Sequence, residues 1–155
     1  MKGRKEWTVG MLAVSEENPM RETGRGRPNA LVVVAHWDDE IIAAWGAMVD
    51  YECTVICLTD KHSVHYERIF GQLVTSLGGE PQSWNCPIRQ PSGRFTQLFT
   101  RENVARLAEQ MRCRDYRFCF THHFNCDVGG HPQHAMAAAL AYAAIGAAGL
   151  QERIE

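Results

Sequence analysis

Short apolar runs alternate with helix-like patterns along most of the chain. ALVVVA (residues 30–35) is a continuous and largely β-branched run, typical of a strand that is buried on both faces of a sheet. CTVICLT (53–59) is a second run of this kind. SWNCPI (83–88) and YRFCFTHH (116–123) are weaker runs with the same character. The pattern therefore predicts four strands.

A helical pattern follows each predicted strand. Residues from about 38 to 51 follow the first strand, and residues 66–79 follow the second and end in glycine, a common helix terminator. Residues 100–113 open with Thr100, a favourable N-cap residue. The last helix is expected to begin near Pro132, because proline is favoured in a first turn.

Four strand–helix units in series predict one architecture, a doubly wound α/β domain. Its sheet is mostly parallel and carries helices on both faces. In such sheets, ligands bind beyond the carboxyl ends of the strands, at the point where the winding direction reverses. With the first and fourth strands adjacent, polar residues that follow these two strands would meet there.

Composition narrows the class of protein. A length of 155 residues suits a single domain, and a net charge of −2 gives no electrostatic case for binding nucleic acid or an anionic membrane. The longest apolar run (135–150) has 16 residues, short of the roughly 20 that a membrane-spanning helix needs. The six cysteines form no CxxC pair, and the N-terminus lacks the apolar core of a secretory signal. We therefore expect a cytoplasmic protein with no membrane partner.

Polar side chains gather after two of the predicted strands. The sequence HWDDE (36–40) follows the first strand, and HHFNCDVGGHPQH (122–134) follows the fourth. His36 and Asp39 are three residues apart across a strand-to-helix turn, so their side chains can converge on one point. His131 and His134 are also three apart, at the start of a helix that places them on one face. Imidazole and carboxylate groups are the ligands of catalytic zinc sites.

Each cluster also has a simpler interpretation. Asp38 and Asp39 can occupy a first helical turn, where the helix dipole favours acids. Either His131 or His134 alone would more often be a capping or surface residue. A metal-binding protein without hydrolytic activity and a non-haem Fe(II) site with two histidines and one carboxylate are further alternatives. The position of both clusters directly after strands favours a metal site.

Two motifs carry a resemblance to a known family. VVVAHWDDE resembles the AHPDDE motif, and GHPQH resembles the GHPDH motif, of the N-acetylglucosaminyl deacetylases of the PIG-L and LmbE-like family. The match runs from about residue 30 to the end of the chain, with the motifs in the same order. The resemblance implies a Rossmann-like fold and zinc-dependent hydrolysis of N-acyl groups, often on N-acetylglucosamine-containing substrates.

The resemblance also implies a role for each motif residue. His36, Asp39 and His134 would bind Zn²⁺. Asp38 would be the general base, and His131 would stabilise the oxyanion or protonate the leaving amine. The chain is thus expected to be a metal-dependent N-deacetylase of a small N-acetylated molecule. The alternative is a catalytically weakened metal- or ligand-binding domain of the same fold, but Asp38, which binding alone does not require, favours an enzyme.

The chain departs from the family pattern near the predicted site. Trp37 replaces the proline of the first motif, and its indole would either stack on a sugar ring or pack under a neighbouring loop. Gln133 replaces an aspartate that can pair with the neighbouring histidine. Ile69 occupies a position that usually carries an acid, which leaves the nearby Arg68 as a candidate substrate contact together with Trp37.

The resemblance also sets the expected domain boundaries. Residues 1–29 form an N-terminal extension, and residues 30–155 form the single LmbE-like deacetylase domain. A fourth strand at the margin of the sheet leaves an unpaired edge, which proteins usually cover. The strand-like stretch EWTVGMLAV (6–14) is a candidate for that cover, and we expect an added N-terminal strand and a homo-oligomer.

Overall fold

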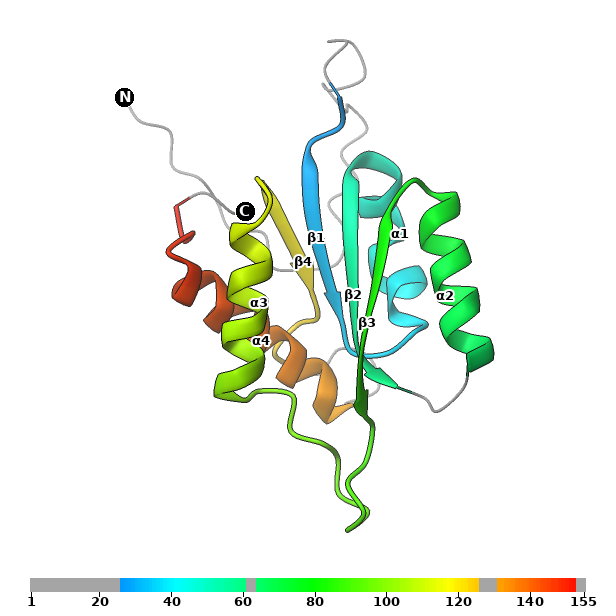
Figure 1. The fold of residues 1–155 in the computed structure, drawn as a ribbon, viewed down its shortest axis with the longest axis vertical. Helices are drawn as coiled ribbons and strands as arrows, with labels where there is room; N and C mark the ends of the chain where they lie inside the picture. The colour runs from blue at the N-terminus through cyan, green and yellow to red at the C-terminus, as the bar shows by residue number, and fades with distance from the viewer. Residues whose placement is uncertain (1–25, 61–63, 126–130, 153–155) are drawn as a thin grey trace.

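The computed structural model describes residues 26–60, 64–125 and 131–152, and within these ranges strands and helices alternate strictly (Figure 1). This alternation confirms the predicted α/β fold. The elements are β1 (Asn29–Val34), α1 (Asp39–Asp50), β2 (Glu52–Asp60), α2 (Val64–Ser76), β3 (Glu80–Pro87), α3 (Arg101–Arg112), β4 (Phe118–Thr121) and α4 (Pro132–Ala148).

The four strands form one parallel sheet in the order β3-β2-β1-β4. β1 is central, and Val33 lies opposite Ile56 of β2 and Thr121 of β4. The predicted adjacency of the first and fourth strands is therefore confirmed, as is the marginal position of β4. All carboxyl ends lie at the lower edge of the sheet in Figure 1. The winding direction reverses between β1 and β4, so this edge contains the switch point of the sheet.

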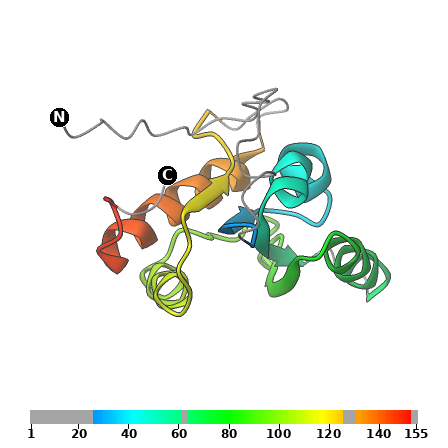
Figure 2. The same ribbon diagram turned by 90° about the horizontal axis from the view of Figure 1, so that it is seen from above.

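Alternate residues of β1 face two separate cores. Leu31 and Val33 pack in the core beneath α3 and α4, whereas Val32 and Val34 pack in the core beneath α1 and α2. Figure 2 shows these two pairs of helices on opposite sides of the strands. The Rossmann-like, doubly wound arrangement is thus confirmed. Burial of β1 on both faces is the reason for its unbroken apolar sequence.

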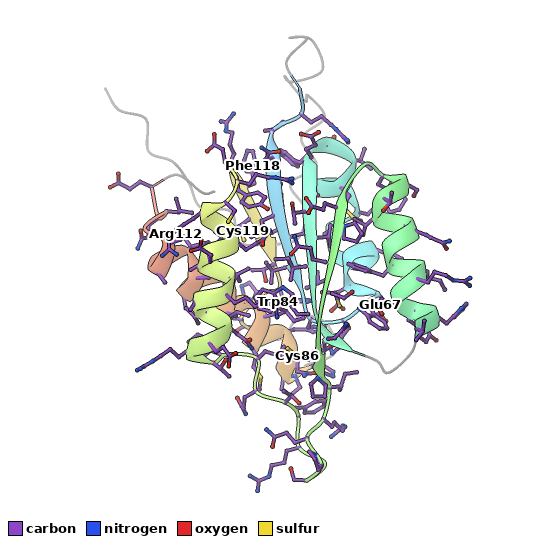
Figure 3. All side chains as sticks on the ribbon, viewed as in Figure 1. Glu67, Trp84, Cys86, Arg112, Phe118 and Cys119 are labelled. Carbon is purple, nitrogen blue, oxygen red and sulfur yellow. The ribbon has the colours of Figure 1, made fainter. Side chains whose placement is uncertain are left out.

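The core beneath α3 and α4 depends on large residues from the sheet and small residues from α4. Trp84 of β3 is buried in this core, and Cys119 of β4 packs against it (Figure 3). The guanidinium of Arg106 covers the Trp84 ring at 4.0 Å from its centroid. Fully buried alanines such as Ala137 and Ala141 allow α4 to approach the sheet closely.

Two strands differ from the prediction by more than one residue. β3 begins at Glu80, three residues earlier than expected from its apolar run. β4 covers only Phe118–Thr121, because the chain leaves the sheet at His122. The ring of His122, rather than the backbone of β4, accepts the hydrogen bond of the Ala35 amide, which directly follows β1 (3.0 Å). The segment 6–14 lies outside the described residues. Within the ranges given above, no helix has the length and apolar character needed to cross a membrane.

Candidate metal centre

Histidine and aspartate side chains gather beyond the carboxyl ends of β1 and β4, at the switch point. His36 and Asp39 come from the turn between β1 and α1. His122 follows β4 directly. His131 is the N-cap of α4, and His134 lies in the first turn of that helix. The structure thus brings together the four histidine and aspartate positions predicted around a metal, with His122 as an addition.

The turn after β1 folds back on itself and points Asp39 inward. The amide of His36 donates to Asp39 Oδ2 at 2.8 Å, and the amide of Asp39 donates to the His36 carbonyl at 3.4 Å. The Asp39 residue is only 7% exposed. Asp38, in contrast, is the exposed N-cap of α1, and its side chain makes no capping hydrogen bond. The two adjacent acids therefore have different surroundings, and helix capping does not account for Asp39.

Three potential ligand groups lie at nearly equal spacing. His36 Nδ1 is 3.3 Å from Asp39 Oδ2 and 3.3 Å from His134 Nε2. His134 Nε2 is 3.5 Å from Asp39 Oδ1. Around a tetrahedral zinc ion with bonds of about 2.0–2.1 Å, ligand atoms lie roughly 3.3–3.4 Å apart. Each of these pairs is therefore spaced as two ligands of a zinc-sized ion would be, with His36 facing one oxygen of the Asp39 carboxylate and His134 facing the other.

His122 is the buried residue that could also serve such an ion. Its Nε2 accepts from the Ala35 amide at 3.0 Å and lies 3.2 Å from Asp39 Oδ2. One nitrogen cannot accept from the amide and donate to the carboxylate at the same time. A cation beside Asp39 would remove this conflict, because the carboxylate would then need no proton from His122. His122, Asp39 and His134 form one candidate ligand group, and His36, His131 and His134 form another.

The surroundings of Asp39 favour its ionised form. Burial alone would raise its pKa, but the interactions of its carboxylate with the His122 and His36 imidazoles and with the His36 backbone amide outweigh that effect. The pKa of Asp39 is consequently held well below its usual range. Asp39 is thus an anion at neutral pH, as a metal ligand must be.

The side chain of Gln133 contacts His36 and not the neighbouring His131. Gln133 Oε1 lies 3.1 Å from His36 Nε2, and Gln133 Nε2 donates to the Ile88 carbonyl at 3.3 Å. The family pattern places at this position an aspartate that can pair with the adjacent histidine. In this chain, only the backbone amide of Gln133 reaches His131, donating to Nδ1 at 3.4 Å.

His131 is placed to donate a proton from its other nitrogen. Because Nδ1 accepts from the Gln133 amide, the neutral ring carries its proton on Nε2. Burial, followed by the charges of His36 and His134, lowers the pKa of His131, although Asp39 acts in the opposite direction. The Phe95 ring packs edge-on against His131 at a centroid distance of 4.8 Å, and the Arg89 guanidinium covers Phe95 at 4.1 Å. The loop after β3 therefore forms one wall of the site.

The two expected substrate contacts have different surroundings. Trp37 is only 6% exposed and packs in the core beneath α1 and α2. Its buried Nε1–H meets no acceptor within the described part of the chain. The indole is thus packed, although in a core rather than under a neighbouring loop, and a role of Trp37 in substrate binding stays a prediction. Arg68 is exposed on α2, and its guanidinium lies 3.5 Å from His65 Nδ1 on the same helix. A role of Arg68 in substrate binding stays a prediction.

Sequence reasoning missed His122, the side-chain partner of Gln133, and Phe95. His122 carried a usable signal, since it directly follows the last strand that borders the switch point. The sequence holds no comparable signal for the contacts of Gln133 and Phe95, because these contacts depend on where the β3–α3 loop folds. The pattern that identified His36 and Asp39 worked because those residues contact each other across a single turn.

Comparisons with known proteins agree on the fold. No protein-family model matches the chain, and no curated protein matches its sequence significantly. The conserved protein TT1542 from Thermus thermophilus has a TM-score of 0.62 at 21% identity, over 83% of this chain and 60% of that protein. An inhibitor complex of N,N′-diacetylchitobiose deacetylase from Pyrococcus horikoshii has a TM-score of 0.64 at 18% identity, over 90% of this chain and 56% of that protein. This chain thus spans 60% and 56% of the two proteins, and it shares their fold.

Proposed function

We propose that this domain is a zinc-dependent amide hydrolase that removes the acetyl group from an N-acetylated sugar or a related small molecule. The observation that carries this proposal is the pairwise spacing of His36, Asp39 and His134, whose imidazole nitrogens and carboxylate oxygens lie 3.3–3.5 Å apart. A second, exposed carboxylate, that of Asp38, directly precedes Asp39 in the sequence. Binding alone would need the first three residues. Hydrolysis also needs a base, and Asp38 supplies one.

His36, Asp39 and His134 are the residues that would hold the metal. Two neutral imidazoles and one carboxylate are a common ligand set of catalytic zinc, which keeps its fourth position open. His122 is the less suitable ligand, because its Nε2 would have to leave the Ala35 amide without a partner. When bound, zinc would polarise the amide carbonyl and acidify a water molecule.

Two side chains would then move the protons. Asp38 is exposed, directly precedes the ligand Asp39 in the sequence, and would accept the proton of the attacking water. His131 would direct its Nε2–H toward the oxyanion that forms as the water attacks. The departing amine takes its proton either from His131 or from the newly protonated Asp38.

The comparisons support the choice of substrate class. One structure with the same fold is a deacetylase of N,N′-diacetylchitobiose, an N-acetylated sugar. The AHWDDE and GHPQH motifs lie at the switch point of the present fold, where ligands of such sheets bind. Both observations favour an N-acetyl group as the target.

An amine-release assay tests the proposal. The full chain, loaded with one equivalent of zinc, is incubated with a panel of N-acetylated mono- and disaccharides, and free primary amine is measured. We expect release that disappears with a chelator and returns with zinc. Zinc binding without release from any member of the panel would instead support the metal-binding alternative.

A further inference from the structure

Gln133 is a completely buried polar residue next to the candidate metal centre. Its relative exposure is 0%, and both ends of its amide are occupied. A buried amide is expensive to desolvate unless it is hydrogen-bonded, so these two contacts fix the side chain. The fixed amide joins His36, at the end of β1, to Ile88, which follows β3.

The Ile88 carbonyl determines which way the Gln133 amide points. A carbonyl can only accept, so the NH₂ group must face Ile88 and Oε1 must face His36. Oε1 can also only accept. His36 Nε2 must therefore carry a proton, and a neutral ring then has none on Nδ1. The lone pair of Nδ1 faces Asp39 Oδ2 and His134 Nε2, each at 3.3 Å.

We propose that Gln133 is a positioning residue that sets the tautomer of His36 and presents Nδ1 for metal binding. This inference rests on the proposed zinc site. A hydrogen bond from the outer nitrogen of a ligating histidine orients the ring and tunes its affinity for the metal. Here, a neutral amide makes that bond.

The amide suits this position better than a carboxylate would. Glutamate could accept from His36 Nε2, but its second oxygen would face the Ile88 carbonyl, and two acceptors repel each other. The Gln133 backbone amide separately holds His131 Nδ1. Side-chain substitutions at residue 133 therefore act on His36 and leave the His131 contact in place.

The tautomer of His36 can be measured without metal. In ¹⁵N-histidine-labelled, metal-free protein at pH 8, above the ordinary histidine pKa of about 6.5, long-range ¹H–¹⁵N spectra identify the protonated nitrogen. We expect the His36 proton on Nε2. A proton mainly on Nδ1 in the wild-type protein would overturn the proposal, whether or not the protein later binds zinc or hydrolyses an amide.

Three substitutions distinguish the loss of the hydrogen-bond acceptor at residue 133 from the effect of any glutamine-to-methionine change. Gln133→Met keeps the volume and removes the acceptor, so we expect Nδ1–H to appear and zinc affinity to fall by about 10–100-fold. Gln133→Glu keeps an acceptor for His36, and we expect it to retain the Nε2–H tautomer. Gln97→Met removes an exposed glutamine elsewhere and should change neither quantity.

Each result bears on the proposal. An unchanged tautomer and zinc Kd in Gln133→Met would contradict it. A folded Gln133→Glu variant that loses the Nε2–H tautomer would also contradict it, because its carboxylate still offers His36 Nε2 an acceptor. If Gln133→Met does not fold, the wild-type and Gln133→Glu spectra still decide. A correct wild-type tautomer without zinc binding would count against the zinc site alone.

Discussion

Two segments build the metal centre in different ways. The turn after β1 closes through contacts between residues three positions apart, namely the His36 amide with the Asp39 carboxylate and the Asp39 amide with the His36 carbonyl. The segment after β4 joins the centre through long-range contacts. Gln133 reaches His36 across 97 positions and Ile88 across 45, and His122 reaches Ala35 across 87.

The first segment contributes reactive groups, and the second segment contributes residues whose positions depend on the rest of the fold. The turn after β1 supplies the proposed base and two ligands within four residues, so it forms wherever its strand and helix form. The rings after β4 reach the site only because β4 lies beside β1 and the loop after β3 folds under α4. Substitutions of the polar side chains in the first segment should therefore change reactivity, and those of His122 and Gln133 in the second should change geometry and stability.

The largest expected effect is that of Asp38→Asn. Loss of a general base typically reduces the rate by about 10²–10⁴-fold, and Asp38 is not among the proposed ligands. We expect kcat/KM to fall by that factor on a confirmed substrate while zinc content stays at the wild-type value. Asp50→Asn, at the opposite end of α1, is the control and should be close to wild type. Full turnover in Asp38→Asn would show that another group is the base.

Trp37→Ala tests whether the indole in the same turn is part of the core. Truncating a buried aromatic residue typically lowers the free energy of unfolding by about 3–5 kcal/mol. We expect a loss of this size in denaturant unfolding, with KM unchanged. Trp45 lies in α1 and is 46% exposed, so Trp45→Ala should lower the free energy of unfolding much less. A raised KM and wild-type stability in Trp37→Ala would instead show that Trp37 contacts the substrate.

His122→Phe tests the second segment, with a smaller expected effect. Phenylalanine keeps a ring but removes the acceptor, which leaves the Ala35 amide unpaired at a cost of about 1–3 kcal/mol. We expect that loss of stability together with retained zinc binding. His123→Phe changes the exposed neighbour and should lie within about 0.5 kcal/mol of wild type. Loss of zinc from His122→Phe alone would make His122 a ligand.

The fold and the first segment could be predicted because their signals are local. The unbroken run at 30–35 reports burial on both faces, and the spacing of His36 and Asp39 reports a single turn. The end of β4 could not be predicted in the same way. The run 116–123 continues in sequence beyond Thr121, but the ring of His122 competes for the Ala35 amide and ends the strand.

The side-chain partner of Gln133 also could not be predicted from the sequence. In a motif such as GHPQH, the glutamine is naturally paired with the nearby histidine at the start of the same helix, here His131. The observed partner is His36, because α4 begins directly beyond β1 and the Ile88 carbonyl holds the far end of the amide. Such a choice depends on the placement of three segments at once.

Zinc K-edge X-ray absorption of the loaded protein, combined with metal analysis, tests the central claim most directly. We predict one zinc ion per chain, bound by two imidazoles and by oxygen ligands at about 2.0–2.1 Å. His134→Ala should lose one imidazole from the spectrum together with most of the zinc affinity. Three or more imidazoles in the wild-type protein, or no stoichiometric zinc in the folded chain, would contradict a centre built from His36, Asp39 and His134.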